Sequence, residues 1–406
     1  MSAKRPTRHR FDDQRIRRLE QHFARYVDDG RLPGFQVLVG HGGELAYEAT
    51  YGQRDVETAT PWSTDTIFRL YSNTKIVTSV AALMLWEQGA FELRTPVHHF
   101  IPAFKDTPVY KVGNASSPIT VPQMEPMRMW HLFSHTSGLT YGFLHANPVD
   151  AIYRNNGFEW GTPPGLDLAG VCDKLATLPL AFQPGTEWNY SMSIDVLGRI
   201  IEICSGMPLD EFFRTHIFAP LSMADTNFWC PPEKQDRLAA LYAPLGPNRT
   251  AVRFDAMGAP AKTQPDVLLG GGGLVGSAHD YFKFLLALSG QGEFNDVRLL
   301  APKTVEMMRS NHLPGNANLD TFGRPLFAET SFDGVGFGLG VSVTTNTVAS
   351  KAPGSVGDFG WGGAASTWAM IDPVEDLTVF FATQLLPSST WPIRSEIRPL
   401  IYQALL

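Results

Sequence analysis

Ser72 and Lys75 form a serine-x-x-lysine tetrapeptide, and this pair is the feature of the sequence best suited to nucleophilic chemistry. Three positions apart on a helix, a hydroxyl and an amine lie on one face about a turn apart. At that separation the amine can take or hold the serine proton, which activates the oxygen for attack on a carbonyl carbon. The spacing alone is weak evidence, because a chain of this length produces it by chance, so the surrounding sequence decides.

The residues after Ser72 predict a buried helix that begins near the serine. Apolar side chains occupy nearly every face of the run 76–85, and Gly89 supplies a glycine end to the helix. In the first turn of such a helix, free amide donors and the positive end of the helix dipole favour a developing oxyanion. The alternative is that Ser72 is only a helix cap and Lys75 a surface residue, but a surface lysine fits poorly among apolar neighbours.

Two further segments have the composition to complete an acyl-transfer site. Tyr190 follows a Pro-Gly turn and precedes a helix predicted over 193–204, a position from which a phenol can point into a cleft. Residues 359–364 are rich in glycine and lead into a predicted strand, where a substrate can approach the backbone and meet amide donors. Taken singly, these are more simply a core tyrosine and a glycine bulge, so they matter as a set with the Ser-Lys pair.

Other chemistries fit the sequence less well. The sequence contains no Gly-x-Ser-x-Gly, which excludes the nucleophile elbow of an α/β-hydrolase. A Ser-His-Asp triad through His135 is an alternative, although residues 135–139 are more simply a structural turn. His131 and His135 have i, i+4 spacing without a third ligand, and the Gly-x-Gly-x-x-Gly match at 271–276 lies outside any βαβ unit. We therefore expect neither a metal nor a cofactor.

Composition narrows the partners and the compartment. The chain has 406 residues, 44% of them hydrophobic and 18% charged, with a net charge of −7. No basic stripe occurs outside the first eighteen residues, which are predicted to be a solvated arm leading into a helix that ends at Gly30. The sequence shows no signal peptide, membrane span or disulfide framework. We expect a cytoplasmic protein that acts on a small molecule without nucleic acid or membrane, as a monomer or weak homo-oligomer.

Strand patterns occur near both ends of the chain, and helical patterns lie between them. The strands are predicted over 35–39, 44–48, 337–343, 366–371 and 377–381, before a C-terminal helix from about 391. This order predicts an α+β fold in which both chain ends form one antiparallel sheet, flanked by helices, with a mostly helical insertion. Residues 1–70 plus 236–406 are predicted to form a discontinuous α/β domain and residues 71–235 a mainly helical domain, with the active site at their interface.

Five motifs, in this order, resemble those of serine β-lactamase-like proteins. They are Ser72-x-x-Lys75, His135-Thr136-Ser137-Gly138-Leu139, Pro184-Gly185 followed by Tyr190-Ser191, Gly270 to Leu274, and Trp361-Gly362-Gly363. The resemblance covers the chain from about residue 15 onward. Within that superfamily the chain looks most like the family VIII carboxylesterases, which resemble class C β-lactamases in fold but carry Trp-Gly-Gly in place of Lys-Thr-Gly. This resemblance implies a β-lactamase/DD-peptidase-like fold.

The resemblance also implies roles for individual residues. Ser72 becomes the acylated nucleophile, Lys75 and Tyr190 share the general-base and acid work, and the amides of Ser72 and Ala364 form the oxyanion hole. Neither an amine nor a phenol is a good base at its ordinary pKa of about 10, but burial disfavours an ammonium, and a neighbouring ammonium lowers the pKa of a phenol. Which of the two groups removes the serine proton stays open.

Two departures from the β-lactamase pattern bear on the substrate. Met192 stands where those enzymes have an asparagine, and Trp361 stands where they have the lysine of Lys-Thr-Gly. The groups that hold a β-lactam carboxylate are therefore absent from these positions, so we expect an uncharged ester to be favoured and lactam hydrolysis to be weak or absent. The predicted substrate-binding residues are Trp361, Gly362, Gly363, Tyr141 and Phe143.

The sequence therefore predicts a serine carboxylesterase that hydrolyses small or short-chain acyl esters through an acyl-enzyme. An acyltransferase, or an amide, D-peptide or β-lactam hydrolase of the same fold, is the alternative, because the sequence does not reveal the acyl acceptor. A catalytically inactive ligand-binding homologue is the alternative from a different class, and the presence of all three catalytic candidates argues against it.

Overall fold

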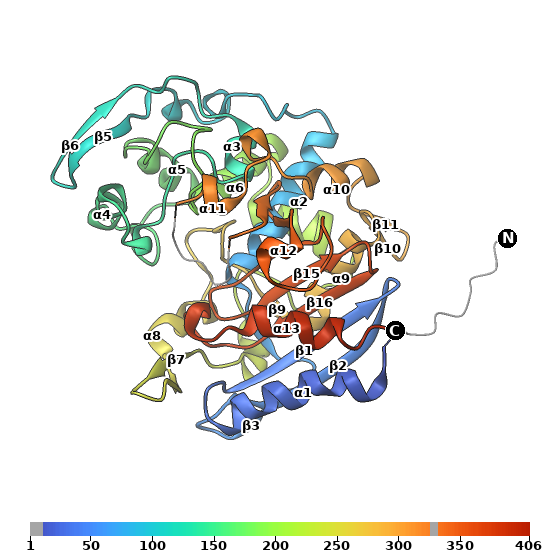
Figure 1. Cartoon of the computed structure of the whole chain (residues 1–406). Coiled ribbons are helices and arrows are strands. Elements are labelled where there is room, and N and C mark those ends of the chain that lie inside the picture. The colour runs from blue at the N-terminus through green and yellow to red at the C-terminus, as the bar shows by residue number, and fades with distance from the viewer. Residues whose placement is uncertain (1–10, 325–331) are drawn as a thin grey trace.

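The computed structural model describes residues 11–324 and 332–406, and an eight-stranded antiparallel sheet crosses its centre (Figure 1). The strand order is β12-β13-β14-β15-β16-β1-β2-β3, so β1 near the N-terminus pairs with β16 near the C-terminus. The bounds are β1 Gly34–His41, β2 Glu44–Asp55, β3 Thr60–Pro61, β12 Val335–Phe337, β13 Ser342–Thr344, β14 Phe359–Gly362, β15 Trp368–Asp372 and β16 Leu377–Ala382. The predicted α+β fold, with one antiparallel sheet formed from both chain ends, is confirmed.

Helices cover both faces of this sheet. Alternate residues of β1 point to opposite sides: Val37 and Val39 pack with α1 (Asp13–Asp28) and α13 (Ile393–Tyr402), whereas Leu38 belongs to the core on the other face. The helix α9 (Ala278–Ser289) lies on that other face. Both the amphipathic first helix and the C-terminal helix were predicted from the sequence. Of the basic arm predicted over the first eighteen residues, residues 1–10 lie outside the described residues, whereas residues 13–18 already belong to α1.

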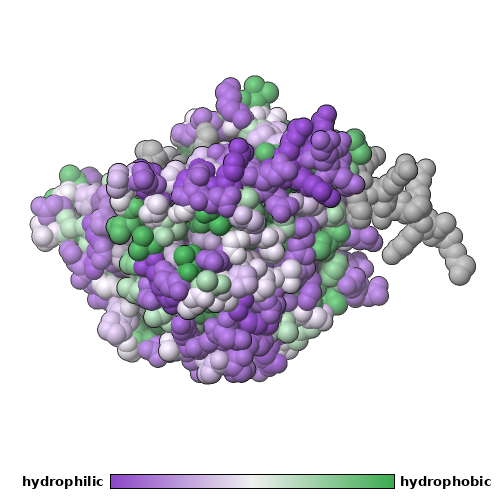
Figure 2. All heavy atoms as spheres, turned by 90° about the horizontal axis from the view of Figure 1, so that it is seen from below, coloured by the Kyte–Doolittle hydropathy of each residue, from purple (hydrophilic) through white to green (hydrophobic). Residues whose placement is uncertain are grey.

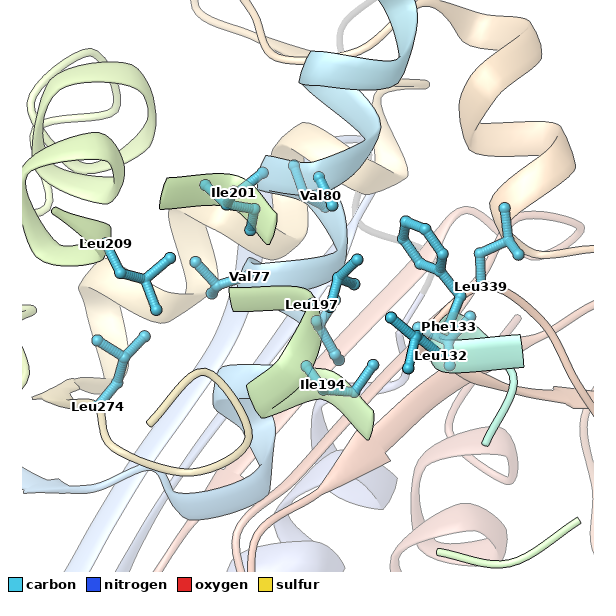
Figure 3. Close-up of a cluster of buried hydrophobic side chains, with 14 of the residues drawn as sticks. Val77, Val80, Leu132, Phe133, Ile194, Leu197, Ile201, Leu209, Leu274 and Leu339 are labelled. Atoms are coloured by element: carbon cyan, nitrogen blue, oxygen red, sulfur yellow. The ribbon is translucent and has the colours of Figure 1, made fainter. Parts of the chain in front are cut away.

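The helical part of the molecule is built around α2 (Thr74–Glu87) and α6 (Ser193–Ser205). Apolar side chains of both helices pack against residues of α3 (Met129–Phe133) and of the loop at Leu274 (Figure 3). The helix α2 ends at Glu87, and Gln88 and then Gly89 follow. Gly89 has φ +78°, so it terminates the helix in the left-handed conformation, as predicted from the sequence. Gly206 ends α6 in the same left-handed conformation. The nearly all-round burial of α2 explains why its sequence is apolar on almost every face.

Smaller elements complete the chain. The helices are α3 Met129–Phe133, α4 Pro148–Asn155, α5 Leu168–Ala176, α7 Leu209–Phe213, α8 Asp255–Gly258, α10 Pro302–Met308, α11 Leu319–Phe322 and α12 Thr347–Ser350. The two-stranded pairs are β4 Ile67–Arg69 with β9 Val275–Ser277, β5 Val109–Asn114 with β6 Ser117–Val121, β7 Tyr242–Leu245 with β8 Thr250–Arg253, and β10 Glu293–Phe294 with β11 Val297–Arg298. The β5–β6 hairpin, which the sequence did not predict, projects from the helical side (Figure 1).

One predicted strand is wrong in its extent. Residues 337–343 do not form a single strand: β12 ends at Phe337, the chain reverses, and β13 begins at Ser342. Gly340 adopts φ +86°, and a Cβ there would overlap the Ser79 side chain of α2, so the turn packs directly on the buried helix. Residues 359–362 also differ from the prediction, because they form the strand β14 itself and do not merely precede a strand.

The division into two domains at residues 70/71 and 235/236 stays a prediction. No helix of the described chain is long and apolar enough to cross a membrane. The face of the molecule in Figure 2 is mostly polar, and its apolar side chains lie in small separate groups. This face therefore presents no broad apolar area.

Leu197 provides a test of the packing between α2 and α6. Its side chain is fully buried among Val77, Val80 and Ile201 (Figure 3). We expect Leu197→Ala to lower the free energy of unfolding by about 3 kcal/mol, because it removes buried methyl groups and leaves a cavity. Chemical denaturation measures this change, with Leu245→Ala as the matched control, since Leu245 is 64% exposed. A loss below about 1 kcal/mol would contradict the packing described.

Candidate active site

Ser72 lies in a tight turn between a strand and the buried helix. The 3-10 turn Tyr71–Asn73 joins β4 to α2, and Ser72 itself is half-buried. Tyr71 adopts φ +46°, a left-handed conformation that costs a non-glycine residue on the order of 1 kcal/mol or more. Such strain persists only where neighbouring contacts hold it in place.

Those contacts come from three other segments. Asn73 donates its side-chain amide to Thr367 Oγ1 at 2.8 Å, and the Tyr281 hydroxyl donates to the Asn73 carbonyl, also at 2.8 Å. Thr74 Oγ1 accepts the Leu274 amide at 3.1 Å. The two residues between Ser72 and Lys75 therefore hold the turn against the residue before β15, against α9 and against the glycine-rich loop 270–274, a role that sequence reasoning did not identify.

Lys75 is 1% exposed and lies against Ser72, as the Ser-x-x-Lys spacing predicts. Its Nζ donates to Ser72 Oγ at 3.4 Å, to Tyr141 Oη at 3.1 Å and to the Gly271 carbonyl at 2.5 Å. An ammonium has three N–H donors, and here each has an acceptor. The buried amine is thus accommodated in its charged form, with one proton directed at the serine oxygen.

Tyr190 completes the group around Lys75. The Lys75 Nζ lies 4.5 Å from the centroid of the Tyr190 ring, within the range of a cation–π interaction. Trp361 Nε1 donates to the Tyr190 hydroxyl at 3.3 Å, which joins the tyrosine to β14. Tyr190 is 4% exposed and lies three residues before the first residue of α6. The structure therefore brings Tyr190 and Trp361 to the Ser72–Lys75 pair, although the three segments lie far apart in the sequence.

Asp195 is a further member of this site that sequence reasoning missed. It lies in the first turn of α6, is 2% exposed, and accepts the Gly271 amide at 2.8 Å. Burial raises the pKa of Asp195, while the charge of Lys75 and hydrogen bonds from Gly271 and Tyr141 oppose that rise. A buried carboxylate near a buried ammonium offsets part of the cost of burying either charge. The only sequence signal was an acidic residue on the buried face of a helix.

Tyr141, predicted to bind substrate, contacts Lys75 and Asp195. Burial and the nearby Asp195 carboxylate raise the pKa of the Tyr141 phenol, so it stays protonated while it links the two charged groups. Phe143 stacks between Tyr141 and Trp160, with ring centroids 4.7 Å and 5.2 Å away. Substrate contact by Tyr141 and Phe143 stays a prediction.

The end of β14 lies beside the Ser72 turn. A Cβ at Gly363 would overlap the Leu70 carbonyl, so only glycine permits this close approach. The pairing of β13 with β14 involves only Phe359 and Gly360, which leaves the outer edge of Trp361 and Gly362 unpaired with β13. Such an edge can present its backbone groups to a substrate.

A cavity of about 280 Å³ opens onto this group of residues. Its lining includes Ser72, Tyr190, Trp361, Gly362 and Ala364, and apolar side chains of Leu319, Phe332 and Val335 form another part of the wall. Tyr141 and Phe143 are not among the described residues that line it. The Ser72 hydroxyl and the Tyr190 phenol thus line one partly apolar space, and the Lys75 amine contacts the serine oxygen from within the protein, an arrangement suited to acyl transfer.

The two histidines of the alternative hypotheses have other contacts. His135 Nδ1 hydrogen-bonds with Ser191 Oγ at 3.0 Å, and within residues 11–324 and 332–406 it forms no hydrogen bond with Ser72. Burial and the nearby Lys75 charge lower the pKa of His135, so it is neutral at pH 7. His131 Nδ1 accepts the Arg128 amide at 2.9 Å. Over the described residues, no group of three His, Cys, Asp or Glu side chains is arranged to hold a metal ion.

Comparison with known proteins identifies relatives over nearly the whole chain. Residues 19–398 match the model of the Beta-lactamase family. Protein Rv1367c of Mycobacterium tuberculosis is 36% identical over 366 residues, which cover 89% of this chain and 88% of that protein. Esterase EstB of Burkholderia gladioli is 29% identical over 401 residues, covering 95% and 94%. The solved structure of EstCE1, described as a hydrolase with promiscuous acyltransferase activity, matches with a TM-score of 0.80 and 27% identity, covering 96% and 99%.

His131 makes the stability of this region depend on pH. Burial lowers the pKa of His131 to about 3 from its ordinary 6.5, so below pH 6.5 the unfolded chain binds a proton that the folded chain does not. We expect the free energy of unfolding to fall by about 2 kcal/mol more in wild type than in His131→Gln between pH 6.5 and pH 4.5. Denaturant titrations at each pH measure the difference, and His99→Gln, at an exposed position, is the control. Parallel profiles for wild type and His131→Gln would contradict a neutral buried imidazole.

Proposed function

Because the chain belongs to the Beta-lactamase family, we propose that it is a serine carboxylesterase that hydrolyses small or short-chain acyl esters through an acyl-enzyme. The observation that supports this most directly is the 3.4 Å contact between Ser72 Oγ and the buried Lys75 Nζ at the wall of a partly apolar cavity. The esterase name of EstB and the hydrolase title of EstCE1 support the same reaction class.

In the proposed first half-reaction, Ser72 Oγ attacks the ester carbonyl carbon. Lys75 donates a hydrogen bond to Ser72 Oγ, so we assign the role of proton acceptor to Tyr190 in its phenolate form, whose negative charge the Lys75 ammonium stabilises until the serine proton is transferred. The tetrahedral oxyanion accepts hydrogen bonds from the amides of Ser72 and Ala364, and the C–O bond then breaks. The departing alcohol takes the proton from Tyr190, which leaves the acyl group on Ser72.

In the second half-reaction, the alcohol has left and water attacks the acyl-enzyme. Tyr190 takes a proton from water, hydroxide oxygen adds to the acyl carbon, and Ser72 leaves with the proton returned to it. Trp361, Gly362 and Gly363 are proposed to line the substrate site, with Tyr141 and Phe143 at its border. This scheme needs no metal and no cofactor.

Transfer of the acyl group to an alcohol is a second candidate function. It is favoured by the description of EstCE1 as a hydrolase with promiscuous acyltransferase activity, since that protein is similar over nearly the entire chain. An alcohol and water attack the same acyl-enzyme, so both reactions use the same residues. Product analysis with an added short-chain alcohol distinguishes them, because transfer yields a new ester and hydrolysis yields only the free acid.

We also propose the setting in which the enzyme works. Its substrate is a small molecule, as for the esterases it resembles, and it acts without nucleic acid or membrane. Its proposed location is the cytoplasm and its proposed state a monomer or weak homo-oligomer. The active site is proposed to lie between an α/β domain (1–70 plus 236–406) and a mainly helical domain (71–235).

Covalent labelling tests the proposed nucleophile. After incubation with a 4-nitrophenyl short-chain ester or a fluorophosphonate, we expect wild type to gain one adduct on Ser72, measured by intact-protein and peptide mass spectrometry. Ser72→Ala should gain none and lose essentially all turnover, whereas Ser116→Ala, at an exposed serine, should behave as wild type. Tyr190→Phe should slow turnover at least 100-fold. Absence of an adduct on folded wild type, or an adduct at another residue, would refute the proposal.

Asp195 is proposed as a positioning residue for Lys75. We expect Asp195→Asn to lower kcat about 10-fold or more, because it removes the negative charge that accompanies the buried ammonium. Burial raises the pKa of Asp195. On acidification, wild-type kcat should therefore begin to fall at a pH above the usual pKa range of an aspartate. Asp195→Asn should lack this decrease on the acid side of the pH profile. The pH profile of kcat measures both effects.

Asp173→Asn on the exposed face of α5 is the matched control for that change. If Asp195→Asn keeps the kcat of wild type, or if the acid side of its pH profile is unchanged, the carboxylate has only a structural role. Tyr141→Phe extends the test, since it removes the hydroxyl between Lys75 and Asp195 without changing any charge.

A further inference from the structure

The cavity that contains Ser72 has a positively charged end. It continues along α12 and α13, where its charged lining residues are Lys351, Arg394 and Arg398. None of the described residues that line it is an aspartate or a glutamate. A cleft lined by charges of one sign raises the local concentration of a ligand of opposite charge.

Lys351 supplies an accessible charge at this end. It follows the last residue of α12 and is exposed, in contrast to the buried Lys75. Within the described parts of the chain, its ammonium forms no hydrogen bond and no ion pair with another side chain. An ammonium in this state can bind an anion without first breaking an interaction within the protein.

Arg394 brings a second charge close to the reacting groups. Its Nη2 donates to the carbonyls of Gly363 and Thr367, each at 3.3 Å, which holds the guanidinium against the end of β14. A Cβ at Gly362 would overlap this guanidinium, so the glycine makes room for it. Burial lowers the pKa of Arg394 to about 9, and the nearby Tyr190 opposes that decrease, so the side chain is charged at pH 7.

Arg398 contributes less to the net charge. Its guanidinium pairs with the buried Asp358 carboxylate, with N–O distances of 2.9 Å and 3.0 Å. This pair connects α13 to the segment before β14 and largely balances its own charge. The excess positive charge of the cavity therefore comes chiefly from Lys351, with Arg394 nearer to Tyr190.

We propose that the preferred ester substrate carries a carboxylate, which Lys351 binds at the α12–α13 end of the cavity while the ester carbonyl lies at Ser72. This inference rests on the proposed esterase function and specifies its substrate class. It modifies the expectation of an uncharged substrate, which followed from the absence of a lysine at position 361. The cations of this cavity come instead from α12 and α13, segments whose position beside Ser72 is set by the fold.

Matched pairs of esters test the proposal. On the acyl side, 4-nitrophenyl hydrogen adipate is compared with 4-nitrophenyl hexanoate, and on the alcohol side, 4-acetoxybenzoate with its neutral methyl ester. For each pair the ratio of kcat/KM for the anionic ester to that for the neutral ester is measured. We expect Lys351→Glu to lower this ratio at least 10-fold for one of the pairs, because it reverses the charge next to the carboxylate.

The variants separate this effect from general damage to the enzyme. Lys351→Gln should lower the ratio by a smaller factor than Lys351→Glu does. In both variants kcat/KM for the neutral esters should stay within about twofold of wild type, since Lys351 is not one of the residues proposed to act on the ester bond. Lys111→Glu on the exposed strand β5 is the charge-matched control and should leave every ratio unchanged. The Lys351 effect should also shrink in 0.5 M salt, which screens exposed charges.

Two negative results have different meanings. Turnover of neutral esters, with anionic-to-neutral ratios that Lys351→Glu leaves unchanged for both pairs, would overturn the carboxylate proposal and leave the esterase function intact. No turnover of any ester, together with no adduct on Ser72, would refute the esterase function and this inference with it.

Discussion

The burial of the Lys75 ammonium is the constraint on which the rest of the site depends. Moving such a charge out of water costs several kcal/mol unless hydrogen bonds and opposite charge compensate. Here the Gly271 carbonyl, the Tyr141 hydroxyl and the Ser72 oxygen accept hydrogen bonds from its three N–H groups, and the Asp195 carboxylate lies nearby. Each compensating group comes from a different segment, so the charge can be buried only when those segments have packed together.

The same packing positions the nucleophile. The turn before α2 has a strained residue at Tyr71. A hydrogen bond from Asn73 to Thr367 and one from the Leu274 amide to Thr74 hold the turn against the start of β15 and the loop 270–274. The close approach of Gly363 to the Leu70 carbonyl places the end of β14 at the same point. A helix and a strand nearly three hundred residues apart in the sequence therefore meet at the serine, which is what an oxyanion site built from two backbone amides requires.

Trp361 shows how one substitution in a motif can be understood only with its surroundings. At this position an indole donates to the Tyr190 hydroxyl and adds an apolar wall to the cavity. Positive charge is nevertheless present beside the tyrosine, because Arg394 of α13 occupies the space that Gly362 leaves open. The electrostatics of the site are thus a property of the sheet and the C-terminal helix together.

The sequence by itself determined the features that depend on neighbours along the chain. The 3-residue spacing of Ser72 and Lys75, the apolar run of α2 and the glycine at 89 suffice to predict a serine and an amine on one buried helix, and strand patterns at both ends predict the shared sheet. Only the tertiary structure decided that Asp195 and Tyr141 surround Lys75, that Lys351 and Arg394 line the cavity, and that residues 337–343 turn where they meet α2. The physical reason is that local spacing sets which side chains share a face, whereas contacts between distant segments follow from how those faces pack.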